Sequence, residues 1–107
     1  MQAGFDIEIS GDPPKTLTVR VSGELDLAAR PIVTEQVTAA VAEEADIERV
    51  VIDLGGVKFC DSSGLGALLD IRRVAERLGA AIVLRSPSAG VARVLDIAGI
   101  DELLPRE

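Results

Sequence analysis

Several residue types with well-known chemical uses are absent or scarce in this chain of 107 residues. It contains no His, Trp or Tyr, one Cys and two Phe. Because His is the commonest general base and the commonest transition-metal ligand, its absence excludes a Ser-His-Asp or Cys-His catalytic arrangement and a zinc site of Cys and His. The single thiol, Cys60, has no partner for a disulfide within the chain.

Long hydrophobic runs are also missing. No apolar stretch reaches the roughly 18 residues that cross a bilayer. The first ten residues have neither the basic start nor the apolar stretch of a secretory signal. With an unpaired cysteine, these features predict a cytoplasmic protein. The 11 basic and 18 acidic residues give a net charge of −7, which repels nucleic-acid phosphates and anionic lipid. We therefore expect neither nucleic acid nor membranes as partners.

The remaining composition is that of a globular domain. Apolar residues make up 48% of the chain and charged residues 27%. A chain of this length buries one hydrophobic core, so we expect one domain over residues 1–107. Because aromatics are only 2%, that core must consist of Val, Ile, Leu and Ala.

Two kinds of strand pattern occur. Near the N-terminus apolar and polar residues alternate on either side of a turn signal, Gly11-Asp12-Pro13-Pro14, which predicts an antiparallel hairpin. Later runs are continuous and rich in β-branched residues, as in strands that other elements cover on both faces. The predicted strands are 5–10, 16–22, 49–54, 80–85 and a short last one at 102–104, with a loop at 55–61.

Three segments repeat apolar residues at helical spacing. The first ends near Glu44, the second spans 63–78, and the third follows Ser86-Pro87-Ser88; Gly79 and Gly99 are typical helix-ending residues. The predicted order is β-β-α-β-α-β-α-β, an α/β fold with a mixed sheet whose first strand is antiparallel to the rest. The expected buried stripes are Val33, Val37, Ala40 and Val41; Leu68, Ile71, Ala75 and Leu78; and Val91, Val94, Leu95 and Ala98.

The most unusual segment runs from Phe59 to Gly66, between a buried strand and a helix. Capping the helix needs one polar residue, yet Asp61, Ser62 and Ser63 stand in a row. A Ser or Asp of this run is expected to cap the helix. We expect Ser63 to be the cap or a first-turn residue, which leaves Ser62 freer to meet a partner. Gly64 and Gly66 then keep the first turn free of bulk, so that a partner can approach closely.

Enzyme-like interpretations of this segment fail on missing residues. Gly64 and Gly66 match the start of a dinucleotide fingerprint, but its third glycine is replaced by Leu69. A Walker A ending and a nucleophile elbow are both missing. Cys60 is expected to be a small buried hydrophobe. Three scattered carboxylates, Asp26, Asp53 and Asp61, are weak evidence for a hard-metal site. We expect no enzyme activity, no cofactor and no bound metal.

Long stretches of the chain resemble a known family. GELD at 23–26, VVIDLGGVKFCDSSGLGALL at 50–69 and SPSAGVARVLDIAGIDELL at 86–104 resemble the STAS domain. The resemblance is closer to the bacterial anti-sigma factor antagonists, or anti-anti-sigma factors. It covers nearly the whole chain, and the D-S-S-G-L-G loop is its most specific part.

The resemblance implies a mechanism. An antagonist of this family binds an anti-sigma factor that is also a serine kinase, which frees the sigma factor. The kinase then phosphorylates the first serine of the loop with ATP, and binding ends; a separate serine phosphatase restores the antagonist. By position, Ser62 is the phosphorylated residue, and Asp26 is the family's acidic residue near that serine. The implied partner-binding residues are Asp26, Asp61, Ser62, Ser63, Gly64, Leu65 and Gly66.

Two other roles stay open. A STAS module also serves transporters, as the tail of an anion transporter or as an accessory of a lipid-transport complex. The serine at position 62 favours the antagonist, whereas a membrane segment upstream in the full gene would favour the transporter. A nucleotide hydrolase has the least support, because the chain lacks both His and a phosphate-binding loop.

Overall fold

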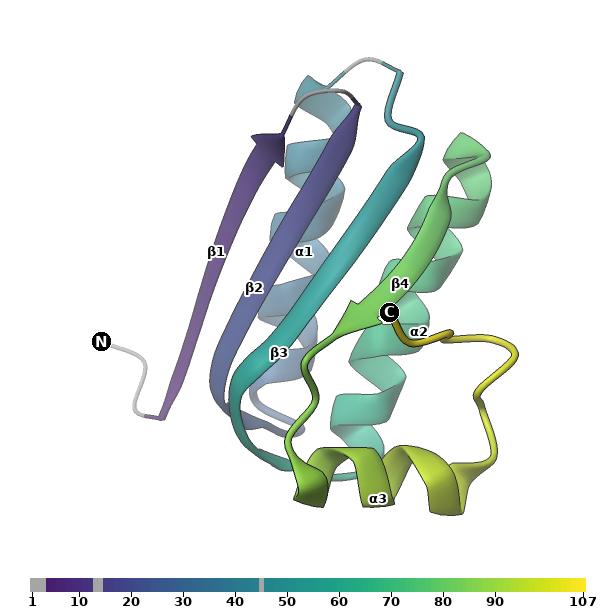
Figure 1. Cartoon of the computed structure of the whole chain (residues 1–107). Coiled ribbons are helices and arrows are strands. Elements are labelled where there is room, and N and C mark those ends of the chain that lie inside the picture. The colour runs from purple at the N-terminus through teal and green to yellow at the C-terminus, as the bar shows by residue number, and fades with distance from the viewer. Residues whose placement is uncertain (1–3, 13–14, 45) are drawn as a thin grey trace.

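The structure is a computed structural model that describes residues 4–12, 15–44 and 46–107. Its four strands form one sheet in the order β1-β2-β3-β4, in which β1 is antiparallel to β2 and the other neighbours are parallel. This arrangement confirms the expected mixed α/β sheet (Figure 1). In chain order the elements are β1 (Phe5–Asp12), β2 (Thr16–Leu25), α1 (Ala29–Glu43), β3 (Arg49–Cys60), α2 (Ser62–Leu78), β4 (Ala81–Arg85) and α3 (Ala89–Ala98).

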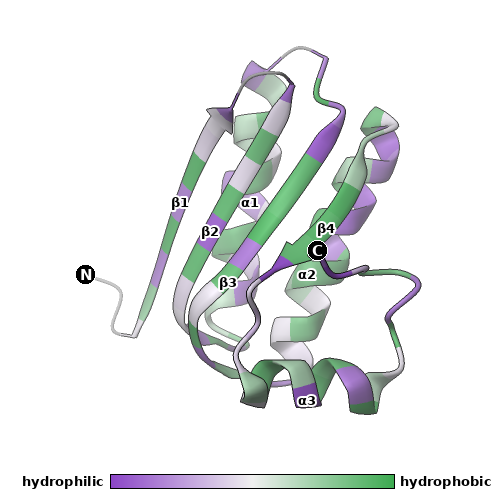
Figure 2. Ribbon diagram, in the orientation of Figure 1, coloured by the Kyte–Doolittle hydropathy of each residue, from purple (hydrophilic) through white to green (hydrophobic). Residues whose placement is uncertain are grey.

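The first two strands form the expected hairpin. Ile7 pairs with Val21 and Ile9 with Val19, so the apolar residues of both strands share one face, and hydropathy alternates along β1 and β2 in Figure 2. The strand β1 extends to Asp12, beyond the predicted end at residue 10. The prolines of the turn signal, 13–14, lie outside the described residues.

The third strand is much longer than expected. The loop predicted over 55–61 is wrong, because β3 continues to Cys60. The reason is pairing with β2, which itself runs on to Leu25 and lies beside β3 as far as the pair Leu25–Cys60. Two register shifts, between Arg20 and Ser22 and between Gly23 and Glu24, carry this pairing past the glycines of β3.

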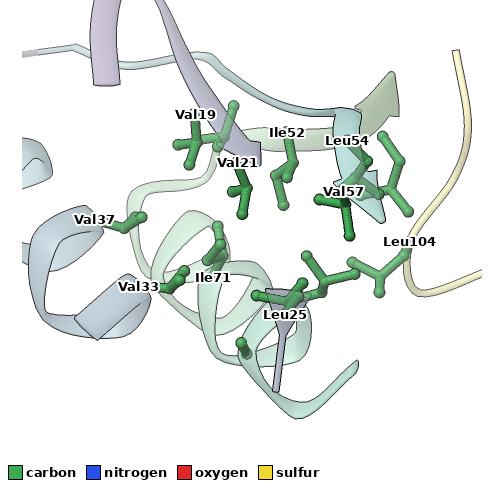
Figure 3. Packing of buried hydrophobic residues seen from close by; sticks show 14 of the residues in the cluster. Val19, Val21, Leu25, Val33, Val37, Ile52, Leu54, Val57, Ile71 and Leu104 are labelled. Atoms are coloured by element: carbon green, nitrogen blue, oxygen red, sulfur yellow. The ribbon is translucent and has the colours of Figure 1, made fainter. Parts of the chain in front are cut away.

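The helices α1 and α2 lie on one face of the sheet, and α3 crosses near its lower end in the view of Figure 1. Figure 3 shows valine, isoleucine and leucine side chains of the sheet and both helices meeting in one core. Leu68, Ile71 and Ala75 are buried as expected, but Leu78 is 40% exposed. The prediction for Leu78 is wrong because the stripe drifts round α2, and this residue closes the last turn before Gly79.

The C-terminal segment differs from the prediction. Residues 102–104 form a turn instead of a strand, and Leu104 is buried in the core. The extended contact comes later, where Arg106 forms an isolated parallel bridge with Leu84 of β4. Only Leu84 of β4 is fully buried, because β4 lies at the end of the strand order. In α3, Val91 and Leu95 are buried, while the expected Val94 and Ala98 are half-buried and exposed.

In the described part of the chain, α1 and α2 leave the other face of the sheet uncovered (Figure 1). Register places Glu8, Arg20, Asp53 and Arg85 side by side across the four strands. Arg20 pairs with Asp53 at 3.5 Å, and Arg85 pairs with Glu107 at 2.8 Å. Charges of alternating sign therefore form one row across this face.

Candidate functional site

The two sequence motifs meet at the carboxyl ends of neighbouring strands. Leu25 at the end of β2 pairs with Cys60 at the end of β3, so Asp26 and Asp61 directly follow two paired residues. The backbone N–H of Asp61 also donates to the Leu25 carbonyl at 3.4 Å. The structure thus brings together the two acidic residues expected near Ser62, at the lower end of the sheet in Figure 1.

Asp61 is the residue that caps α2. Its side chain accepts a hydrogen bond from the N–H of Gly64 at 2.9 Å, and its carbonyl accepts from Leu65 at 3.0 Å. Ser63 is a first-turn residue, one of its two expected positions, and not the cap, because the backbone leaves the strand at Asp61 in the extended conformation that an N-cap requires. Ser62 and Ser63 are therefore the first two residues of the helix.

The two serines differ in exposure. Ser62 is exposed and Ser63 is half-buried. The Asp61 carboxylate before them accepts from the N–H of Gly64. Of the two hydroxyls, that of Ser62 is therefore the more accessible from solvent.

The glycines of the loop are used within the chain. A Cβ at Gly64 would collide with the carbonyl oxygen of Leu25 and lie 2.9 Å from the Cys60 sulfur. Gly64 is also buried, so the room there serves the packing of α2 on β2 and not the approach of a partner. At Gly66, a Cβ would lie 2.5 Å from Nη1 of Arg30, which occupies that space.

Asp26 lies in the turn that leads from β2 into α1. Its Oδ1 accepts from the N–H of Ala29 at 3.1 Å, and its carbonyl accepts from the N–H of Arg30 at 3.1 Å. The side chain is half-buried. Asp26 therefore holds the start of α1 while its carboxylate lies at the strand ends beside Asp61.

Cys60 lies under this site. It is 6% exposed, and burial, with a smaller effect of the Asp61 charge, raises the pKa of its thiol to about 11. The thiol is therefore neutral at physiological pH and unreactive. This agrees with the expectation of a small buried hydrophobe.

Sequence reasoning missed a polar cluster between α1 and α2. Arg30 donates to Asp70 from Nε at 3.0 Å and from Nη2 at 3.3 Å, and the Thr34 hydroxyl donates to Asp70 at 3.0 Å. The hydrogen bond from Arg30 lowers the pKa of the Asp70 carboxyl, and Thr34 and the charges of Arg30 and Arg73 act in the same direction, against desolvation. No local pattern relates residues 40 positions apart, so only the fold reveals this pair.

Two exposed apolar side chains flank the site. Leu27 directly follows Asp26 and is 71% exposed, and Phe59 directly precedes Cys60 and is 51% exposed. Large exposed apolar residues beside a polar loop are typical of surfaces that bind another protein. The position of both residues next to the recognised motifs was the signal that could have found them.

Potential metal ligands and membrane-spanning helices were sought in the part of the chain that the structure describes. No group of three or more His, Cys, Asp or Glu side chains comes together there. Asp53, one of the three scattered carboxylates, pairs with Arg20 within the sheet. No helix in residues 4–12, 15–44 and 46–107 is long and apolar enough to cross a membrane.

Comparisons with known proteins agree with this geometry. The family model described as "Mlab, STAS domain" matches residues 10–105. An anti-sigma F factor antagonist of Paenibacillus polymyxa is 33% identical over 89 residues, which cover 83% of this chain and 75% of that protein.

Solved structures share the fold. The anti-sigma factor antagonist SpoIIAA in its unphosphorylated form has a TM-score of 0.79 at 22% identity, over 95% of this chain and 88% of that one. Part of the murine anion transporter Slc26a9 has a TM-score of 0.72 at 25% identity, over 82% of this chain and 14% of the transporter.

Proposed function

This chain belongs to the STAS domain family, and we propose that it is an anti-sigma factor antagonist whose binding ends when Ser62 is phosphorylated. The observation that carries the proposal is an exposed Ser62 directly after the capping Asp61, at the strand ends where the two motifs meet. The curated relative at 33% identity, an antagonist by name, supports the same role. The partner is an anti-sigma factor that is also a serine kinase.

The switch is a phosphoryl transfer to the serine hydroxyl. The Ser62 oxygen attacks the γ-phosphorus of ATP, the bond from that phosphorus to the bridging oxygen breaks, and ADP leaves. The hydroxyl proton passes to a base of the kinase. Water later attacks the phosphorus of the phosphoserine in a separate serine phosphatase; inorganic phosphate leaves and the hydroxyl is restored.

Added charge explains why binding ends. A phosphate brings about −1.5 to −2 charge to a surface that already holds the carboxylates of Asp26 and Asp61. The exposed side chains of Leu27 and Phe59, next to the two motifs in the sequence, contribute to binding only if water is removed around them. A doubly charged group is costly to desolvate, so the apolar contact with the partner is lost. The phosphate also adds repulsion between like charges at the interface.

The domain itself tolerates the modification. Ser62 is the first residue of α2, where free backbone N–H groups and the helix dipole favour negative charge. Ser62 is also exposed, so the phosphate displaces no core residue. Phosphorylation is therefore expected to change binding and to leave the fold intact.

Affinity capture from the source cell tests the role. Three baits are compared: the wild type, Ser62→Ala and Ser62→Asp. The proteins that each bait captures are identified by mass spectrometry. We expect an ATP-binding anti-sigma factor on the first two baits and its loss on Ser62→Asp. Equal capture of that protein by all three baits would contradict the switch.

A transporter module is the second candidate, and the match to the anion transporter Slc26a9 is the observation that favours it. The same experiment separates the two roles. Subunits of a transporter on all three baits, with no anti-sigma factor on any, would favour the second candidate.

A further inference from the structure

The side chain of Arg30 lies against the first turns of α2. Nη1 of Arg30 is 2.5 Å from the position that a Cβ on Gly66 would occupy. Any larger residue at position 66 would displace the guanidinium. Gly66, the second glycine of the D-S-S-G-L-G loop, therefore makes room for a cation of this chain near Ser62.

The edge of the guanidinium that carries Nε and Nη2 is held by Asp70. Nε and Nη2 donate to the Asp70 carboxylate at 3.0 and 3.3 Å, a two-point contact that sets the plane of the group. Nη1 takes no part in that contact, and it is the Arg30 atom nearest to the position of a Cβ on Gly66, with Cζ and Nε also within 3.1 Å. The side chain of Arg30 is 40% exposed, so a ligand can reach it from solvent.

Helix geometry puts Nη1 of Arg30 within reach of Ser62. Residues four positions apart lie one above the other on a helix, about 6 Å apart along its axis, so Gly66 lies directly above Ser62. We propose that Arg30 binds the phosphate on Ser62 of its own chain through Nη1, while Asp70 keeps the guanidinium in place. This inference rests on Ser62 being the phosphorylated residue.

The charges around Ser62 favour such a contact. The nearest acidic side chains, Asp26 and Asp61, follow the paired strand ends and repel a phosphate. Among the neighbouring cations, Lys58 precedes the site on β3, and Arg73 lies 11 residues farther along α2, about 16 Å along the axis. Arg30 is thus a cation that the fold holds against Gly66, in the first turns of α2.

Asp70 does not depend on Arg30 alone. It also accepts from the Thr34 hydroxyl at 3.0 Å and from Arg73 at 3.4 Å. The carboxylate that anchors Arg30 is therefore itself held by two further donors. In the phosphorylated state Arg30 would cover the first turn of α2. Partner binding would then be prevented by this internal ion pair as well as by the added charge of the phosphate.

The test uses the whole chain with phosphoserine encoded genetically at position 62, so it needs no kinase. The second pKa of the phosphate, about 6 for a free phosphoserine, is measured by phosphorus NMR titration. Arg30→Ala should raise that pKa by about one unit, because an adjacent cation favours the dianion. Arg73→Ala removes the same charge and another contact of Asp70 but should leave the phosphate pKa unchanged.

Arg30→Gln is the second variant, since it keeps the length of the side chain and a donor for Asp70 if Arg30→Ala fails to fold. It should raise the phosphate pKa as Arg30→Ala does. Equal pKa values in the wild type, both Arg30 variants and Arg73→Ala would overturn the inference. A kinase that phosphorylates another residue would overturn the proposed function instead, and the two failures are therefore distinguishable.

Discussion

Gly64 of α2 packs directly against the carbonyl oxygen of Leu25 at the end of β2. This contact fixes the first turn of α2 to the strand end from which Asp26 emerges. Since Asp61 also caps α2 through the N–H of Gly64, one residue holds the helix start, the loop and the neighbouring strand together. The position of Ser62 depends on that contact.

Gly64→Ala is therefore expected to destabilise the protein by about 1–3 kcal/mol or more, because the collision is with backbone that has little freedom to move. Gly90→Ala is the matched control, since nothing lies within 4 Å of a Cβ there and the residue is also in a helix. Urea unfolding of both variants measures the difference. Equal stability of the two variants would contradict the packing at Gly64.

The thiol of Cys60 predicts a loss of stability at alkaline pH. Burial raises its pKa from an ordinary 9.0 to about 11, so the unfolded chain releases this proton first as pH rises. The stabilising contribution is complete below about pH 9 and is lost toward pH 11, by up to about 1.4 kcal/mol per pH unit. Urea unfolding between pH 8 and 11 should show this extra decline in the wild type. An equal decline in Cys60→Ala would assign it to other groups.

Asp26→Asn separates the structural role of this residue from its functional one. The amide oxygen still accepts from the N–H of Ala29, so stability should change by less than about 0.5 kcal/mol. The rate at which the cognate kinase phosphorylates Ser62 should fall, because the charge at the strand ends is gone. Asp26→Ala, which also loses the hydrogen bond, should lose about 1 kcal/mol of stability. An unchanged phosphorylation rate in Asp26→Asn would limit Asp26 to capping.

Leu27 and Phe59 are expected to contribute apolar contact to the partner. Leu27→Ser and Phe59→Ser should each weaken binding by about tenfold, which corresponds to roughly 1.4 kcal/mol, without loss of stability. Leu78→Ser is the control, because Leu78 is also exposed but lies at the other end of α2, about 24 Å from Ser62 along the axis. Binding is measured by calorimetry against the purified anti-sigma factor. Equal weakening by all three variants would place the interface elsewhere.

Local patterns were sufficient to predict most of the fold. Helical spacing identified the buried stripe of α2, and Gly79 and Gly99 end their helices in the left-handed conformation, at φ of 70° and 66°. The length of β3 was not predictable in this way. Gly55 and Gly56 have the composition of a loop, and their strand conformation depends on pairing with β2, a contact distant in the sequence.

In the candidate site, too, some features follow from local sequence and others depend on contacts distant in the sequence. The resemblance located the loop, but Asp, Ser and Thr compete for helix caps with similar strength, so the choice between Asp61 and Ser63 depended on where the backbone leaves the strand. The cluster of Arg30 and Asp70 joins two helices and has no local signature. Its detection required the packing of α1 against α2.

The central claim is that Ser62, and not Ser63, switches binding to an anti-sigma factor with kinase activity. The most direct measurement is a binding titration of the wild type, Ser62→Ala and Ser62→Asp against that kinase, with mass spectrometry of the wild type after ATP is added. We predict phosphate on Ser62 alone, retained binding by Ser62→Ala that ATP does not release, and far weaker binding by a normally folded Ser62→Asp. Phosphate on Ser63, or tight binding by Ser62→Asp, would contradict the account.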